Sequence, residues 1–156
     1  MIAPMPVAVR AAAAADVEPL MEQFSELWKD DPPAEHRALI DALLGGTVRG
    51  PYPAALLVAD DAGRVTGFVL VGERSHADGC DERHPVGYVE GWYVVPGARA
   101  TGVGRALIEA AEAWARAQGC REMASDTWHD NEPSILAHQA LGYELVEHVV
   151  LFRKAL

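Results

Sequence analysis

The sequence predicts one α/β domain in which strands and helices alternate along the chain. Its 156 residues, of which 50% are hydrophobic, are enough for a single core. No linker long enough to divide the chain interrupts this pattern. Between Val94 and Val103, a strand pattern passes through a glycine-rich turn into a long amphipathic helix pattern, a junction typical of α/β proteins. We therefore treat residues 1–156 as one domain.

The first part of the chain predicts a strand followed by two helices. Val7 to Arg10 favours a strand, and Asp16 is a suitable cap for the helix that follows. That helix carries its apolar residues on one face: Val17, Leu20, Met21, Phe24, Leu27 and Trp28. A second helix is expected over Glu35 to Leu44, because Gly45-Gly46 then ends it.

The rest of the chain continues the alternation. Two strands form a hairpin around Asp60-Asp61-Ala62-Gly63. The expected elements are strands over 55–59, 65–71 and 86–95, a helix over 103–118, a strand over 122–125, a helix from Asn131 or Ser134 to Leu141-Gly142, and a strand over 143–152. The predicted order is thus β-α-α-β-β-β-α-β-α-β.

The turn after the third of these strands predicts a phosphate site. Pro96 ends the strand, and the glycines let backbone N–H groups approach an anion at the start of the next helix. A nucleotide triphosphate P-loop is excluded, because Val103 stands where that loop needs lysine. A dinucleotide fingerprint starting at Gly102 and Gly104 is excluded as well, since Leu107 is too large for its third small position.

The charge balance restricts the partners. Asp and Glu outnumber Lys and Arg by 23 to 13, which gives a formal charge of −10. Such a chain repels nucleic acid and anionic membranes and favours cationic ligands. We therefore expect a small cationic partner, no nucleic acid and no membrane.

The cysteines and histidines predict neither a disulfide framework nor a metal. Cys80 and Cys120 have no CxxC spacing, and no signal peptide or long apolar run is present, so a cytoplasmic location is expected. His129, Asp130 and His138 fall on different turns and elements, so they do not have the spacing of metal ligands.

The chain resembles the GCN5-related N-acetyltransferase (GNAT) superfamily through Arg99-x-x-Gly102-x-Gly104. It is more narrowly similar to the aminoglycoside 6′-N-acetyltransferases. The segments that carry this likeness are residues 88–94 (YVEGWYV), 102–108 (GVGRALI), 120–127 (CREMASDT), 131–134 (NEPS) with His138, and 141–144 (LGYE) with 152–154 (FRK). The resemblance implies a GNAT fold: a central splayed mixed sheet with helices on both faces.

The resemblance also implies acetyl-coenzyme A (acetyl-CoA) as co-substrate, with direct attack in a ternary complex. The strand backbone would bind the pantetheine arm where the sheet splays, and the turn would bind the pyrophosphate. The implied contacts are Trp92, Tyr93, Val94, Arg99, Ala100, Thr101, Gly102, Val103, Gly104, Arg105, Asn131 and Ser134. Asn131 has a second interpretation as a helix cap.

The acceptor side is implied to be acidic. Trp28, Glu90, Asp126 and Glu147 match positions that line the sugar site in the family. A carboxylate near the amine stabilises its ammonium form, so one acid must take the proton as attack proceeds. We expect Asp126 to do this, with Glu90 as second choice.

His138 is expected to contribute to catalysis, because it stands where many superfamily members have a tyrosine that protonates the thiolate. A packing or cofactor contact is the alternative interpretation of His138. The family also implies a homodimer, which the apolar ending Val149-Val150-Leu151-Phe152 permits. Other possible functions are acetylation of a polyamine or a peptide N-terminus, and non-catalytic binding of an acyl-CoA.

Overall fold

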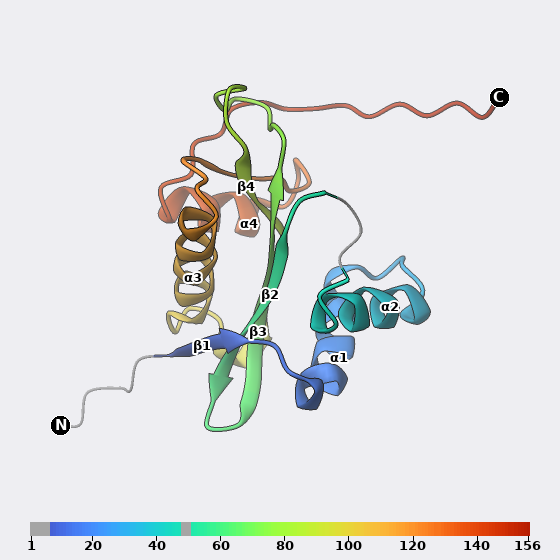
Figure 1. The fold of residues 1–156 in the computed structure, drawn as a ribbon, viewed down its shortest axis with the longest axis vertical. Helices are drawn as coiled ribbons and strands as arrows, with labels where there is room; N and C mark the ends of the chain where they lie inside the picture. The colour runs from blue at the N-terminus through green and yellow to red at the C-terminus, as the bar shows by residue number, and fades with distance from the viewer. Residues whose placement is uncertain (1–6, 48–50) are drawn as a thin grey trace.

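The computed structural model describes residues 7–47 and 51–156, and its centre is a five-stranded sheet (Figure 1). The strands lie in chain order: β1 (Ala8–Ala11), β2 (Ala54–Asp61), β3 (Arg64–Arg74), β4 (Val86–Val94) and β5 (Met123–Ser125). Neighbouring strands are antiparallel except β4 and β5, which are parallel. The mixed sheet predicted from the sequence is therefore confirmed.

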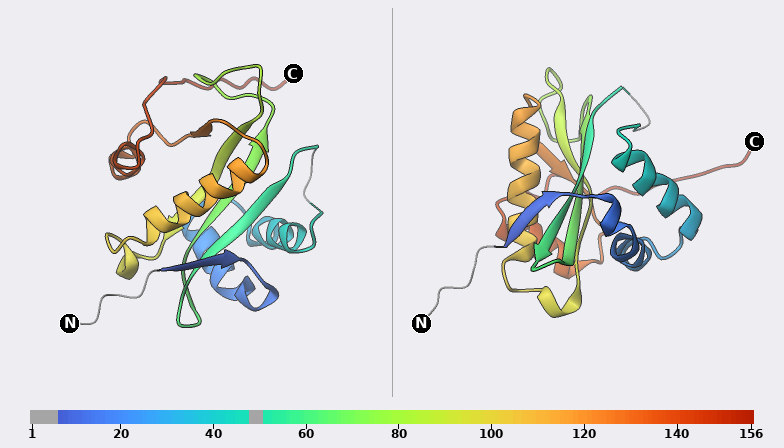
Figure 2. Two further views of the ribbon diagram at one scale, coloured as in Figure 1. Left: turned by 60° about the vertical axis from the view of Figure 1, so that its left-hand side comes forward. Right: turned by 60° about the horizontal axis from the view of Figure 1, so that its bottom comes forward.

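Helices cover both faces of this sheet, as Figure 2 shows from two further directions. One face carries α1 (Val17–Leu27), preceded by the 3₁₀ turn η1 (Ala14–Asp16), and α2 (Pro33–Leu44). The other face carries α3 (Val103–Ala117) and α4 (Glu132–Ala140), with the 3₁₀ turn η2 (Pro96–Ala98) between β4 and α3. All four predicted helices form, with ends shifted by one or two residues.

Each face of the sheet has its own apolar core. The α1/α2 face buries Leu20, Phe24, Ile40, Leu56, Val58, Phe68 and Leu70. The α3 face buries Val69, Val71, Val89, Val103, Leu107, Ile108 and Ala111. Because β3 supplies both sets with alternate side chains, its sequence is almost continuously apolar and buried. The rigid layer that results supports β4, on which the candidate site is built.

The hairpin between β2 and β3 forms as predicted around a two-residue turn. Ala62 and Gly63 both have positive φ, of 51° and 91°, the combination that type I′ hairpin turns require. Asp60 Oδ1 accepts a hydrogen bond from the Gly63 N–H at 2.7 Å, which fixes the turn.

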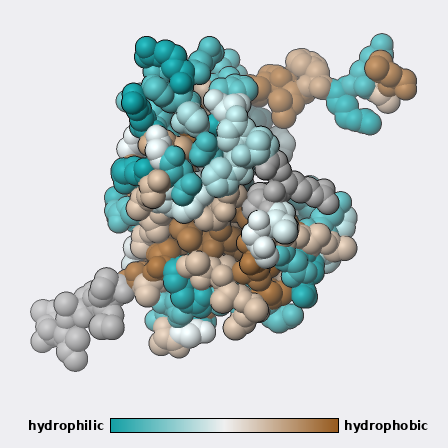
Figure 3. Space-filling model, in the orientation of Figure 1, coloured by the Kyte–Doolittle hydropathy of each residue, from teal (hydrophilic) through white to brown (hydrophobic). Residues whose placement is uncertain are grey.

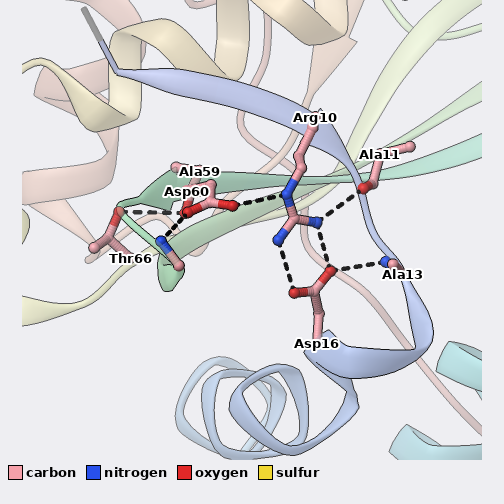
Figure 4. A network of polar contacts seen from close by, with 8 residues as sticks. Arg10, Ala11, Ala13, Asp16, Ala59, Asp60 and Thr66 are labelled. Carbon is pink, nitrogen blue, oxygen red and sulfur yellow. Dashed lines mark hydrogen bonds and ion pairs between the residues drawn. The ribbon is translucent and has the colours of Figure 1, made fainter. Parts of the chain in front are cut away.

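Asp16 differs from its predicted role as the cap of α1. Its carboxylate makes no capping bond to α1 and instead accepts hydrogen bonds from the Ala13 N–H at 2.7 Å and from the Arg10 guanidinium at 2.7 and 2.9 Å (Figure 4). Arg10 also bonds Asp60 on β2. This network joins β1, the turn before α1 and the β2–β3 hairpin, and it lowers the pKa of Asp16 through its hydrogen bonds with Arg10.

Strand β4 carries an irregularity that shapes the sheet. Its pairing with β3 passes from Leu70 opposite Gly91 to Val71 opposite Val89, so Glu90 is an extra residue without a partner, as in a β-bulge. On its other side, β4 pairs with β5 only through Gly87, Tyr88 and Val89. β5 ends at Ser125, opposite Val89, so β4 has no β5 partner beyond Val89. The resemblance implied a separation after Trp92-Tyr93-Val94, and in the structure it begins earlier.

The predicted last strand over 143–152 is wrong for the single chain. Residues 143–156 form no strand: Tyr143 still packs against α3 and α4, and the segment then runs on as an extended tail that leaves the body of the molecule (Figure 1). Its apolar side chains are exposed, Leu151 by 81% and Phe152 by 93%, and Figure 3 shows hydrophobic residues on this projecting segment. A β-pattern needs a neighbouring strand to bond, and this chain places none beside the tail.

None of the helices within residues 7–47 and 51–156 is long and apolar enough to span a bilayer.

Candidate active site

The turn between β4 and α3 presents backbone N–H groups that no side chain caps. Gly102 is the N-cap of α3 with φ 93°, and because glycine has no side chain to cap the helix, the first N–H groups of α3 stay free. Ala100, two residues earlier, also has a positive φ of 58°. A Cβ atom added at Gly97 or Gly102 would meet nothing within 4 Å, so the space in front of the turn is open. An anion fits this position, since the helix dipole favours negative charge there.

Trp92 adds a buried donor near this turn. Its indole packs so closely on α3 that a Cβ at Gly104 would lie 3.0 Å from Trp92 Cζ2. Among the described residues, no acceptor reaches the buried Trp92 Nε1. A buried N–H without a partner is costly, so this donor is suited to a ligand.

Arg99 and Arg105 of the turn make contacts within the chain. Arg99 Nε donates to the Val94 carbonyl at 2.9 Å and its guanidinium lies over Tyr93, 5.5 Å from the ring centre. Arg105 donates to the Ala140 carbonyl at 3.3 Å, which links α3 to the end of α4. Arg105 Nη1 also lies 3.9 Å from Glu109 Oε1, one turn further along α3.

The gap between β4 and β5 exposes strand backbone. Trp92, Tyr93 and Val94 pair with β3 on one side, through Val69, Phe68 and Gly67, and have no β5 partner on the other. In an antiparallel pair, alternate residues direct their backbone groups away from the partner strand, so part of this stretch can bond an extended amide chain by strand addition, although the Val94 carbonyl already accepts from Arg99. This is the stretch at which the sequence predicts that the pantetheine arm binds.

Four polar side chains meet beside this gap, on the α1/α2 side of the sheet. Arg74, at the end of β3, forms a two-pronged ion pair with Glu90, with N–O distances of 2.6 and 2.8 Å. Its guanidinium carbon lies 3.4 Å from the centre of the Tyr88 ring. The Tyr88 hydroxyl in turn donates to Asp126 Oδ1 at 2.6 Å. Glu90 and Asp126, both predicted from the sequence, thus belong to one network.

Burial decides the protonation of this network. Tyr88 is buried, and this burial together with the bond to Asp126 raises the pKa of its phenol, so it remains a donor near neutrality. The hydrogen bonds to Glu90 raise the pKa of Arg74, which keeps its positive charge. One cation therefore lies between two acids before any substrate binds.

A hollow opens next to Glu90. It has a volume of about 330 Å3 and is lined by Leu39, Leu43, Pro51, Tyr52, Pro53, Ala54, Leu70, Gly72, Glu73 and Glu90. A larger hollow of about 910 Å3 lies between α1 and the β2–β3 turn, but no residue of the Arg74 network lines it. Of these two hollows, only the smaller reaches a carboxylate of the Arg74 network, which makes it the candidate acceptor site.

Trp28 lies against the same stretch of β4. A Cβ at Gly91 would come within 2.5 Å of Trp28 Cη2, so only glycine lets the indole approach the strand this closely. Trp28 also packs edge-on against Phe24, with ring centres 5.0 Å apart. The indole is partly buried and continues the apolar core towards Glu90.

His138 is held by hydrogen bonds on both ring nitrogens. Nδ1 lies 2.7 Å from the Ser134 carbonyl, which can only accept, so Nδ1 carries the hydrogen. Nε2 lies 2.8 Å from the Ser125 hydroxyl. The ring stands edge-on between Trp92 and Tyr143, at 5.4 and 5.7 Å between centres. This position joins α4 to β5 one residue before Asp126.

The other residues that the family resemblance implied lie at the start of α4 and on the tail. Asn131 Oδ1 accepts the Ser134 N–H at 3.3 Å, which confirms Asn131 as the cap of α4. Glu147 lies on the exposed tail, and no contact among the described residues joins it to Glu90 or Asp126. Within the same residues, no cluster of three or more histidine, cysteine or acidic side chains is arranged for a metal.

Sequence reasoning missed Arg74 and Tyr88 as site residues. Tyr88 lies two positions before Glu90 on a predicted strand, a spacing that places both on one face of a regular strand. Arg74 ends the preceding strand of the same antiparallel pair, where cross-strand ion pairs are common. Both patterns can be seen in the sequence, but they bring Arg74 and Tyr88 to the site only in a particular pairing of the strands, which the sequence does not state.

The fold and this site define an acyltransferase class, and the comparisons agree. The profile of the "Acetyltransferase (GNAT) family" matches residues 18–143. The chain belongs to this family.

Its relatives are more specific. An aminoglycoside N(6′)-acetyltransferase type 1 of Klebsiella aerogenes is 43% identical over 95% of this chain and 96% of its own length. One of Stenotrophomonas maltophilia is 39% identical over 100% and 97%. The solved structure of AAC(6′)-Iy in complex with the bisubstrate analog CoA-S-monomethyl-acetylneamine has a TM-score of 0.86 at 33% identity, covering 97% of this chain and 100% of that one. The predicted GNAT fold is confirmed.

Proposed function

We propose that this protein transfers the acetyl group of acetyl-CoA to the 6′-amine of an aminoglycoside antibiotic and so confers resistance to it. The observation that carries the proposal is the position of Glu90 and Asp126, two linked carboxylates beside a gap in the sheet that leads to an anion-binding turn. Family membership and the names of the relatives support the same reaction.

The co-substrate fits the observed donors. The free N–H groups at the start of α3, with Arg99 to Arg105 around them, would hold the pyrophosphate. Backbone groups of Trp92 to Val94 would hold the pantetheine, and one N–H would polarise the thioester carbonyl. Acetyl-CoA supplies the activated acyl group, and the chain supplies its position.

The acceptor would bind through its positive charges. An aminoglycoside carries several ammonium groups, for which Glu90 and Asp126 provide charge-assisted hydrogen bonds and Trp28 an aromatic wall. As the free amine attacks, a nitrogen–carbon bond forms, the carbon–sulfur bond breaks and coenzyme A departs as thiolate. Asp126 accepts the proton that the amine loses.

The remaining chemistry follows from the thiols and from His138. Burial raises the pKa of both Cys80 and Cys120, which keeps them protonated and favours direct transfer over an acetyl-cysteine route.

We place His138 near the departing sulfur, where its bond to Ser125 would let a protonated ring pass a proton through the serine hydroxyl. Free cysteines also fit a cytoplasmic enzyme.

A thiol-release assay tests the acceptor. Kanamycin, which has a 6′-amine, is compared with its 6′-hydroxyl analogue at equal concentration. Release of coenzyme A with kanamycin alone supports the proposal. Equal rates with both would overturn the 6′ assignment, and release only with polyamines or peptides would identify another cationic amine as substrate.

We further propose that the protein is a homodimer in which a second copy covers the tail. The tail exposes Leu145, Val146, Val149, Val150, Leu151 and Phe152, an apolar series uncommon on a stable monomer surface. β5 is the last strand of the sheet and leaves one edge to pair. Glu147 lies on the tail, so its contribution to substrate binding depends on how the dimer holds this segment.

Light scattering on Leu151→Asp tests this assembly. The charge would disfavour burial of the tail, so the mass should fall from dimer to monomer. Leu39→Asp is the control, since Leu39 is partly exposed on α2 and distant in sequence from the tail. A wild-type protein that is monomeric at micromolar concentration would refute the dimer.

A further inference from the structure

The hydrogen bond between Tyr88 and Asp126 has a use in the reaction that the proposed function does not contain. The phenol oxygen lies 2.6 Å from Asp126 Oδ1, a short bond of the charge-assisted kind. Asp126 itself is exposed and follows the last residue of β5, so no strand pairing fixes its carboxylate. Without Tyr88, this side chain would be free to rotate.

Tyr88 is well suited to hold a carboxylate still. Its ring is 8% exposed and Tyr88 itself is paired on both sides, with Gly72 of β3 and Ala124 of β5. Arg74 covers one face of the ring and is itself held by two bonds to Glu90. The hydroxyl therefore has a defined position before substrate binds.

The bond also determines which oxygen is free. Tyr88 occupies Oδ1, whereas Oδ2 accepts no hydrogen bond from the described residues. A base must present a lone pair to the amine at hydrogen-bond distance, and a fixed carboxylate does so without the entropy loss of a mobile one.

We propose that Tyr88 is a positioning residue for Asp126: its hydroxyl fixes Oδ1 and directs Oδ2 towards the amine. This inference rests on the proposed function, in which Asp126 accepts the proton. The Tyr88 ring is covered by Arg74 and only 8% of the residue is exposed, so it acts through Asp126.

The proposal has a kinetic signature. Loss of the Tyr88 hydroxyl releases the Asp126 carboxylate, so the rate of the chemical step should fall while substrate binding is kept. The other charged or titratable groups around this pair are Arg74, Glu90 and, through Ser125, His138. None of these is altered when Tyr88 is replaced by phenylalanine, which keeps the ring under Arg74.

The test compares Tyr88→Phe with Tyr143→Phe. Tyr143 is a matched control, because its partly buried phenol also donates to a carboxylate, Glu112 Oε1, at 3.2 Å, on the α3 face of the sheet. We expect Tyr88→Phe to lower kcat about 10-fold, the effect of one charged hydrogen bond, with KM within about twofold. Tyr143→Phe should leave both kinetic constants unchanged.

Two further measurements separate the possible failures. In an Asp126→Asn background, Tyr88→Phe should have no additional effect on kcat, whereas a full additive loss would overturn the positioning role. Carbon NMR relaxation of the Asp126 carboxyl group should show greater mobility in Tyr88→Phe than in the wild type, even without an acceptor. Unchanged mobility refutes the inference, while an inactive wild-type protein whose Asp126 carboxyl group becomes more mobile in Tyr88→Phe refutes only the proposed acceptor.

Discussion

The two halves of the site are built from different parts of the chain. The co-substrate half consists of backbone: the free N–H groups of α3, the positive φ of Gly102 and the unpaired edge of β4. The acceptor half consists of side chains that hold one another, from Arg74 through Glu90 and from Tyr88 to Asp126. The first half depends on conformation, and the second depends on charge and protonation.

This difference predicts how each half responds to change. A substitution in the turn should weaken co-substrate binding if it forces a change in φ, and it should have little effect if it only adds an atom in open space. A substitution in the network should change the kinetic constants through its charge, even when the shape of the side chain is kept. Four experiments, ordered by the size of the expected effect, examine this contrast.

The largest effect is expected for Asp126→Asn. The amide keeps the shape but cannot accept the proton, so kcat/KM should fall about 100-fold or more, within the range of general-base catalysis. Steady-state thiol release measures the loss. Asp130→Asn, an exposed acid on the following loop, is the control and should be near wild type. A rise in KM alone for Asp126→Asn would assign Asp126 to binding and not to proton transfer.

Gly102→Ala should weaken co-substrate binding about 10-fold, because alanine at φ 93° is strained by roughly 1 kcal/mol or more and the turn must shift to relieve it. Calorimetric titration with coenzyme A measures this. Gly97→Ala is the matched control, because a Cβ at either glycine meets nothing within 4 Å and, of the two, only Gly102 has a positive φ. Equal losses for both variants would show that space, and not conformation, limits this half.

Arg74→Met should lower KM for a cationic acceptor by up to about 5-fold, since a partly exposed ion pair is worth about 0.2–1 kcal/mol and Glu90 is then free for the substrate. Thiol-release kinetics at low and high salt measure the change. Arg83→Met, which removes a similar pair with Asp81 in the β3–β4 loop, should leave KM unchanged. A raised KM would mean that Arg74 assists binding.

The smallest effect concerns stability, away from the site. The pKa of Asp16 lies below its ordinary value of 3.8, mainly through the hydrogen bonds with Arg10, so its contribution is present above that value and is lost as pH falls through the lower folded value. Asp16→Asn should melt a few degrees below wild type at pH 6, with the difference narrowing towards pH 2. Asp61→Asn, at an exposed pair, should show little difference at either pH. A constant gap for Asp16→Asn would exclude the ion pair as its cause.

The same contrast explains what the sequence could predict. The strand, turn and helix around Pro96 and Gly102 are set by local preferences, so these elements were predicted almost to the residue. Glu90 and Asp126 were expected from the family resemblance. Their connection through Arg74 and Tyr88 was not, because it depends on which residues of β3, β4 and β5 lie side by side.

The two errors in the fold have a related cause. Asp16 is a residue type that commonly caps helices, but its carboxylate bonds instead to Arg10, six residues earlier. Residues 143–152 have the composition of a strand, but a strand also needs a partner, which this chain does not supply. Local sequence gives a preference in each case, and the tertiary or quaternary neighbour decides the outcome.

The single unpaired residue at Glu90 has a consequence for every side chain that follows it on β4. Alternation along a strand has a period of two, so an inserted residue reverses which face each later side chain takes. Trp92 consequently packs with α3, while Gly91 and Tyr93 turn towards α1. In a regular ladder that kept Glu90 without a bulge, Trp92 would share the face of Tyr88 and its indole would lie on the α1 side, so this extra residue is what turns the indole and its N–H towards α3.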